Sequence, residues 1–191
     1  MNELSDEHIM QDFQSGNTEA IEMIYHRYNN QILNFCLRIL GNRADAEDAT
    51  GEVFLALFSN KYTHNPQAKF STWLFTVARN SCINRLRKRK RFSSLWFSNK
   101  GDKQAQYDVP DTSDTSNELL EKQEAASHVK AAIMQLPLDQ REALVLREYH
   151  SMSYNEIAQV RHCSLENVKI LIFRAREQLR VSLSALMKEA N

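Results

Sequence analysis

The chain has 191 residues, with 24 Lys or Arg and 24 Asp or Glu, and this length allows one ordinary domain or two small ones. The neutral total hides an uneven distribution. Residues 1–60 carry a net charge of −7, whereas residues 61–97 contain nine Lys or Arg and no acid. A basic segment beside an acidic one indicates a polyanion-binding surface next to a separate surface for another partner.

Several classes of protein are disfavoured by the sequence. No uninterrupted apolar run approaches the length of a transmembrane helix, and the N-terminus lacks the pattern of a signal peptide, so we expect a cytoplasmic protein without membrane insertion. The three cysteines, Cys36, Cys82 and Cys163, are widely separated, which predicts reduced, partly buried thiols rather than a metal site. We expect no catalytic residue, no metal, no cofactor and no small-molecule substrate.

An all-α fold is expected, because helix-forming residues dominate, only 4 Gly and 3 Pro occur, and no segment alternates as a strand does. Gly16 and Asn17 indicate the end of a first helix and the cap of the next. Gly41 ends the second helix, and Ser71 is expected to cap a long fourth one after a loop at 62–69. The expected helices after the first are 18–40, 44–60, 71–91, 118–135, 138–149, 154–161 and 165–187.

Residues 98–117 are rich in Asp, Ser, Thr, Gln and Lys, which predicts a flexible linker between domains at 1–97 and 118–191. In the second domain, Ser153 and Glu156 have the spacing of a capping box, and Ser164 is expected to cap the last helix. The helices at 154–161 and 165–187 are separated by a few residues only. This spacing predicts a helix-turn-helix whose second helix enters the major groove, although a plain helical hairpin fits the same pattern.

The segment 79–91 contains seven Lys or Arg and no acid. Such self-repulsion favours a polyanion partner over a simply solvated helix end. The apolar stripe that we expect to pack inward consists of Leu74, Ala78, Cys82 and Leu86. Another face offers amides for base edges and cations for phosphates, namely Asn80, Asn84, Arg87, Lys88 and Arg91.

Aromatic residues precede this basic segment, among them Tyr62, Phe70 and Trp73. Aromatic rings beside a basic groove suit unpaired nucleic acid, because exposed bases stack on them for about 1–3 kcal/mol each. Core packing is the alternative for Trp73 and its neighbours.

Upstream, Asp45, Asp48 and Glu52 fall on one helical face, and the same helix carries an apolar stripe of Ala49, Val53 and Leu57. Ordinary solvation and a favourable helix dipole are one interpretation of these acids. The other interpretation is a docking face for a basic protein, since nucleic acid would be repelled.

Together these segments resemble the extracytoplasmic function group of bacterial RNA polymerase sigma factors. Residues 45–54, DAEDATGEVF, are similar to the family's polymerase-docking helix, and FSTWL at 70–74 with ARN at 78–80 is similar to its promoter-melting segment. Residues 136–141, 153–158 and 167–176 are similar to its terminal helix-turn-helix.

The resemblance implies a factor that binds core RNA polymerase, recognises and opens promoter DNA, and is held inactive by an anti-sigma partner. It assigns polymerase binding to Asp45, Asp48, Glu52 and Phe54. It assigns binding of the melted strand to Tyr62, Phe70, Trp73, Asn80, Asn84, Arg87, Lys88 and Arg91. It assigns duplex binding to Ser164, Asn167, Lys169, Ile170, Phe173, Arg174 and Arg176.

The chain departs from the family pattern at four positions. Gly51 stands where glutamine is usual, and His162 stands in the turn where glycine is usual. Ile170 and Leu171 replace residues that are often polar or basic, which changes the contacts available to the recognition helix.

Two other functions fit part of the sequence. A stand-alone helix-turn-helix repressor would bind duplex DNA without polymerase, but it needs neither the acidic face nor the aromatic loop. A helical adaptor would have only protein partners. An enzyme is least expected, because the sequence has no glycine-rich phosphate loop, metal-ligand cluster or nucleophile–base pairing.

Overall fold

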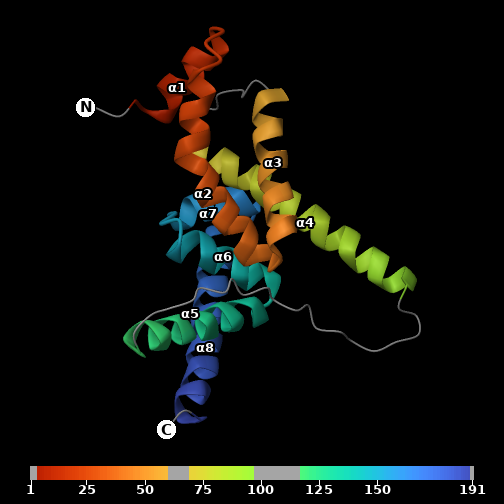
Figure 1. Cartoon of the computed structure of the whole chain (residues 1–191), viewed down its shortest axis with the longest axis vertical. Helices are drawn as coiled ribbons and strands as arrows, with labels where there is room; N and C mark the ends of the chain where they lie inside the picture. Colours follow the sequence, from red (N-terminus) through yellow and green to blue (C-terminus); the bar gives the residue numbers. More distant parts are fainter. Residues whose placement is uncertain (1–3, 60–68, 97–116, 190–191) are drawn as a thin grey trace. The chain divides into compact units, whose positions relative to one another are not determined.

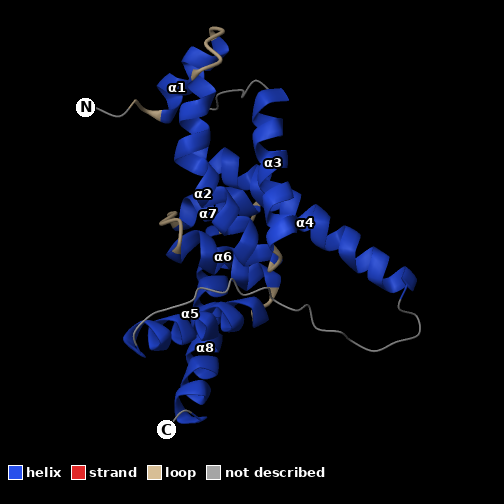
Figure 2. Cartoon of the chain, viewed as in Figure 1, coloured by secondary structure: helices blue, strands red, loops and turns tan. Residues whose placement is uncertain are grey.

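The computed structural model describes residues 4–59, 69–96 and 117–189, and every regular element in these ranges is an α-helix (Figures 1 and 2). The all-α prediction is therefore confirmed. The helices divide into two compact units. The first unit contains α1 to α4, and the second contains most of the residues of α5 to α8. The expected linker at 98–117 lies outside the described residues except for Asn117, with which α5 begins.

The first unit is built around α2, which packs against α1, α3 and α4, while α3 also packs against α4. Apolar residues at helical spacing explain this arrangement: Ala49, Val53 and Leu57 of α3 are fully buried. Leu74, Ala78 and Cys82 of the basic helix are fully buried as well, as the stripe predicted, whereas Leu86 is half-buried. The helices are α1 (Asp6–Gln14), α2 (Ala20–Leu40), α3 (Arg43–Ser59) and α4 (Phe70–Trp96).

Glycines end the first two helices as predicted. Gly41 has a φ of 71°, and its N–H donates to the carbonyl of Leu37 at 2.9 Å. Two helix starts differ from the expectation. Helix α2 begins at Ala20, after a turn in which Asn17 Oδ1 accepts from the Glu19 N–H at 3.1 Å. Helix α4 begins before Ser71 because the Lys69 carbonyl already accepts from the N–H of residues 72 and 73.

A polar cluster holds α1 on α2. Asp6 accepts hydrogen bonds from the guanidinium of Arg27 and the hydroxyl of Tyr28, and Arg27 also donates to the Leu4 carbonyl at 2.9 Å. Burial of the phenol, followed by the hydrogen bond to Asp6, raises the pKa of Tyr28 above its usual range. Tyr28 therefore stays neutral and keeps donating to Asp6 throughout the ordinary pH range.

The remaining helices are α5 (Asn117–Gln135), α6 (Leu138–Glu148), α7 (Tyr154–Arg161) and α8 (Leu165–Glu189), and all of them belong to the second unit except the last residues of α7, at 159–161. Helix α8 packs against α5 and α6. The capping box is confirmed, because the Ser153 N–H donates to Glu156 Oε2 at 2.7 Å and the Glu156 N–H donates to Ser153 Oγ at 3.3 Å. Ser164 caps α8 as predicted, accepting from the Asn167 N–H at 3.2 Å.

All three cysteines are free thiols. Cys36 and Cys82 are buried, and a hydrogen bond between them lowers the pKa of Cys36. Cys163 is partly exposed. Among the described helices, none is long and apolar enough to cross a membrane.

Candidate functional site

The acidic face of α3 is joined to the basic helix α4 mainly by the side chain of Arg85. Its Nη2 lies 2.6 Å from Glu52 Oε1, and its Nη1 lies 3.3 Å from Asp48 Oδ2 and 3.9 Å from Asp45 Oδ1. The Ser81 hydroxyl, one turn earlier on α4, donates to the other carboxylate oxygen of Glu52. Arg85 is only 20% exposed, so this pairing lies between the helices rather than in open solvent.

This pairing affects the exposure and the net charge of the acidic face. Asp48 remains 70% exposed and Glu52 52% exposed, so both carboxylates keep surface available to a basic protein. However, one cation of the chain itself already offsets part of their charge. The residues predicted for polymerase docking are therefore brought together, on a surface whose charge is shared with α4.

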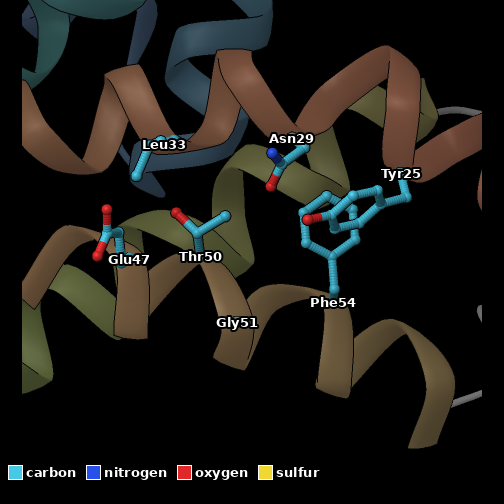
Figure 3. Close-up of a pocket in the computed structure, with 7 residues that line it drawn as sticks. All are labelled: Tyr25, Asn29, Leu33, Glu47, Thr50, Gly51 and Phe54. Atoms are coloured by element: carbon cyan, nitrogen blue, oxygen red, sulfur yellow. The ribbon is translucent and has the colours of Figure 1, made fainter. Parts of the chain in front are cut away.

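A hollow of about 320 Å³ opens between α2 and α3 (Figure 3). Tyr25, Asn29 and Leu33 of α2 line one side, and the other side includes Gly51 and Phe54 of α3. The ring centroids of Tyr25 and Phe54 are 4.9 Å apart. A Cβ atom at Gly51 would meet nothing within 4 Å, so the glycine leaves this part of the hollow open.

Phe54, predicted to bind polymerase, is only 5% exposed. Its ring packs against Tyr25, and we correct the prediction of a direct docking surface to a supporting role at the edge of the hollow. Nearby residues of α3 are more exposed than Phe54: Leu55 is 65% exposed and Phe58 is 51% exposed. Sequence reasoning missed them, although they stand one and four positions after Phe54.

The predicted strand-binding face of α4 is solvent-exposed. Asn80 and Asn84 lie on the same face one turn apart, followed by exposed cations. A hollow of about 580 Å³ runs along this part of the helix. Its lining consists of Glu52, Asn84, Arg85, Arg87, Lys88, Lys90 and Arg91. Six of these seven side chains are on α4, and five are cationic, which is the composition expected of a phosphate-binding surface.

The aromatic residues at the start of α4 behave differently from one another. Phe70 is 1% exposed and packs at a centroid distance of 5.7 Å from Tyr28 and 5.9 Å from Trp73. Its buried ring cannot stack on a base in this conformation, so we correct the prediction and assign Phe70 to the support of Trp73. Trp73 is half-buried and keeps some open surface. Tyr62 lies outside the described residues.

Helix α7, a short turn and α8 form the predicted helix-turn-helix. Val168, Ile172 and Ala175 of α8 are buried, while Asn167, Lys169 and Arg174 are exposed. His162, in the turn, has a φ of 52°, the left-handed conformation that glycine adopts most readily.

Arg176 is not a free phosphate ligand. Its Nη2 lies 2.6 Å from Glu148 Oε1 of α6, and the hydrogen bond to this carboxylate raises the pKa of Arg176. Arg176 therefore ties α8 to α6, a role that the sequence did not suggest. Ser164 is exposed and keeps its cap role at the N-terminus of α8.

Comparison with known proteins identifies the family. Residues 24–92 match the model of Sigma-70 region 2, and residues 128–179 match that of Sigma-70 region 4. The chain is 31% identical over 179 residues to the ECF RNA polymerase sigma factor SigW of Bacillus subtilis, covering 90% of this chain and 92% of SigW. The chain belongs to the ECF RNA polymerase sigma factors.

Other comparisons agree with this assignment. The RNA polymerase sigma-H factor of Pseudomonas aeruginosa is 29% identical over 188 residues, covering 97% of each chain. The sigma factor RpoE of Bartonella quintana, solved in complex with the anti-sigma factor NepR, has the same fold, with a TM-score of 0.71 and 21% identity over 87% of this chain and 98% of RpoE. This ECF factor thus binds core RNA polymerase and directs promoter recognition through regions 2 and 4.

Within the described ranges, no group of three or more His, Cys, Asp and Glu side chains could hold a metal ion.

Proposed function

We propose that the two units of this sigma factor divide promoter recognition between them. The first unit docks on polymerase through α3 and holds the opened strand on α4, while the second binds the upstream duplex through α8. The observation that carries this proposal is the placement of an acidic face and a basic face on adjacent helices of one unit, joined by Arg85. The acidic face fits a basic protein surface, and the basic face fits a polyanion.

For polymerase docking, the argument rests on the exposed carboxylates and on the apolar surface beside them. Asp48 and Glu52 offer negative charge, and Leu55 and Phe58 offer apolar surface on the same helix. A basic, partly apolar helix would complement both. Asp45 contributes less, because at 42% its carboxylate is the least exposed of the three.

For the opened strand, the argument rests on the face of α4. The amides of Asn80 and Asn84 suit the edges of unpaired bases, and Arg87, Lys88 and Arg91 suit the phosphates. Trp73 offers a stacking surface at the start of the same helix. Single strands are favoured over duplex here, because duplex DNA does not expose the faces of its bases.

Run-off transcription with core polymerase tests this division. We expect the chain to give a specific transcript from a suitable promoter only when core polymerase is present. Reversing four charges at once, as Arg87→Glu, Lys88→Glu, Arg89→Glu and Lys90→Glu, should abolish promoter opening, since each phosphate contact adds to a strongly salt-dependent binding energy.

The control is polymerase binding by the same variant, measured by co-elution, which should persist because α3 is untouched. A promoter with a pre-melted bubble separates opening from later steps. Unchanged transcription by the charge-reversed variant would contradict the role proposed for the basic face of α4, whereas a helical adaptor would bind its protein partners and give no specific transcript. Tight, specific duplex binding by the chain without polymerase would support a stand-alone repressor.

We further propose that the factor acts in the cytoplasm, without enzymatic activity of its own, and that an anti-sigma protein holds it inactive. Support for the inhibitor comes from the solved sigma factor RpoE, which has the same fold and is in complex with the anti-sigma factor NepR. An inhibitor of this kind should compete with core polymerase, so adding it should reduce run-off transcription and excess polymerase should restore it.

A further inference from the structure

Helix α8 has a buried side and an outer side whose chemistry differs from that of a typical DNA-binding surface. Val168, Ile172 and Ala175 face the interior of the second unit. At about 100° per residue, the side chains directly opposite this stripe are those that project furthest into a DNA groove. They are Glu166, Ile170, Phe173 and Glu177, all of them exposed.

None of these four residues, which form the outer face of α8, is a cation. Lys169 and Arg180 flank this face on one side, together with Arg176, which is tied to Glu148; Arg174 flanks it on the other. Ile170 is 49% exposed and Phe173 is 67% exposed, one turn apart at i and i+3. Two bulky apolar side chains in water at the centre of a DNA-recognition helix suggest an apolar contact that forms only in the complex.

We propose that Ile170 and Phe173 are specificity-determining residues that contact the methyl groups of thymines in the major groove. This inference rests on the proposed role of the second unit as the reader of upstream duplex DNA, and it deepens that role by naming the base pairs. The flanking cations hold phosphates on both walls of the groove, while the apolar pair selects the sequence.

The chemistry of the major groove selects thymine. Each base pair presents donors and acceptors there, and only the T·A pair presents a methyl group. An apolar side chain against a guanine or adenine edge displaces water from acceptors without replacing its hydrogen bonds. Against a thymine methyl, the same side chain loses nothing and buries apolar surface on both partners.

Geometry indicates that the two thymines occupy neighbouring base pairs. Side chains at i and i+3 of a helix have Cβ atoms about 5–6 Å apart. Successive bases of one strand are about 3.4 Å apart along the DNA axis. A helix lying in the groove therefore places Ile170 and Phe173 within one or two base-pair steps of each other.

The experiment uses holoenzyme assembled from the full chain and core polymerase, with a promoter library randomised over ten upstream base pairs. Transcripts are selected and sequenced, and each thymine of the selected element is then replaced by deoxyuridine. This change removes the methyl group and keeps all base-pair hydrogen bonds. We expect two neighbouring thymines whose replacement each lowers open-complex formation about fourfold, the factor that corresponds to about 0.8 kcal/mol for a buried methyl-sized group.

Two variants connect the effect to the residues. Ile170→Ser should abolish the deoxyuridine effect at one thymine, and Phe173→Ala should abolish it at the other. Both side chains are exposed, so neither variant should disturb the fold, and circular dichroism checks this. Lys169→Ala is the matched control from the flank: it should weaken binding to thymine and deoxyuridine promoters equally and reduce the salt dependence.

Each outcome decides the proposal. A methyl effect that disappears position by position in the two variants supports it. Selection of guanine at these positions, or a thymine-to-deoxyuridine ratio near one, overturns it while leaving the sigma activity itself in place. Complete absence of a specific transcript in the presence of core polymerase would instead contradict the function proposed above.

Discussion

The two units of this ECF sigma factor use their charged residues in different ways. In each unit, a charged residue on a surface predicted to bind a partner is paired with the opposite charge on a neighbouring helix. In the first unit, Arg85 is 20% exposed and bridges three carboxylates of α3. In the second, Arg176 is 54% exposed and meets Glu148 alone.

The difference shows what each pairing can do. A shielded cation with several partners fixes two helices against each other. Its interactions are weakly screened by salt, and few water molecules are available to replace its carboxylate partners. A single exposed pair contributes little, since water competes for both partners. Arg85 therefore holds the polymerase-docking helix and the strand-binding helix in one arrangement, whereas Arg176 is an accessory contact.

The apolar residues show the same contrast. In the first unit, the rings of Phe54 and Phe70, predicted as contact residues, are buried. In the second, Ile170 and Phe173 are exposed on the recognition helix. Buried rings support the shape of a surface, while exposed ones offer contact area to a partner.

Replacing Arg85 should give the largest change in stability. In Arg85→Met, the side chain keeps its length but leaves the carboxylate of Glu52 without its cation, so we expect the first unit to lose about 1–2 kcal/mol of unfolding free energy. Both tryptophans, Trp73 and Trp96, lie in α4, so tryptophan fluorescence in urea follows this unit alone.

A double-mutant cycle with Glu52→Gln isolates the pair. Coupling near 1 kcal/mol or above would support the bridging role of Arg85. Coupling close to zero would remove the contrast between the two units.

Two glycines of the first unit provide a second test, in which the same Gly→Ala substitution should change the free energy of unfolding in opposite directions. Gly51 lies inside α3 with open space around its Cα, so Gly51→Ala should stabilise the first unit by about 0.8–1 kcal/mol through helix propensity. Gly41 has a φ of 71° at the end of α2, so Gly41→Ala should destabilise the same unit by about 1 kcal/mol.

Urea unfolding followed by tryptophan fluorescence measures both variants. A destabilising Gly51→Ala would mean that the hollow between α2 and α3 closes around residue 51 in solution. Gly41→Ala is the matched control, because it differs only in the backbone conformation at the substituted position.

Helical periodicity predicted most of the fold. The spacing of apolar residues placed the buried stripe of α4 at Leu74, Ala78 and Cys82, and local capping signals gave the bounds of α7 correctly. These features depend on residues close together in the sequence, where propensity and capping act. The class of fold and the positions of the helices are therefore readable without tertiary information.

The Arg85 bridge was not predictable in the same way. Its partners are 33 and 37 residues away, and seven cations compete within residues 79–91, so the choice depends on how α3 and α4 cross. The sequence contains only a weak indication of the bridge: Ser81 and Arg85 lie next to the buried stripe of α4, where side chains can reach a neighbouring helix. Likewise, an aromatic residue such as Phe70 has the same sequence signature whether its ring packs in the core or stacks on a base.

A third test concerns the turn of the helix-turn-helix. His162 has a φ of 52°, so His162→Gly removes the steric cost of the left-handed conformation but increases the entropy of the unfolded chain. We expect a net stabilisation of about 0.5–1 kcal/mol, measured by far-UV circular dichroism as a rise in the melting temperature of the helices. His162→Ala should not give this gain, because alanine keeps the Cβ atom; equal effects of the two variants would contradict the backbone explanation.

The smallest change in unfolding free energy is expected on replacing Arg176, which tests the comparison of the Arg85 and Arg176 pairings in the second unit. Arg176→Met removes an exposed pair with Glu148, and we expect a loss of only about 0.2–0.5 kcal/mol, because both side chains are about half exposed. Open-complex formation should fall less in Arg176→Met than in Lys169→Ala, since Lys169 is exposed on the flank of the recognition helix whereas Arg176 is held by Glu148. A loss as large as that of Arg85→Met would show instead that both units depend equally on a bridging arginine.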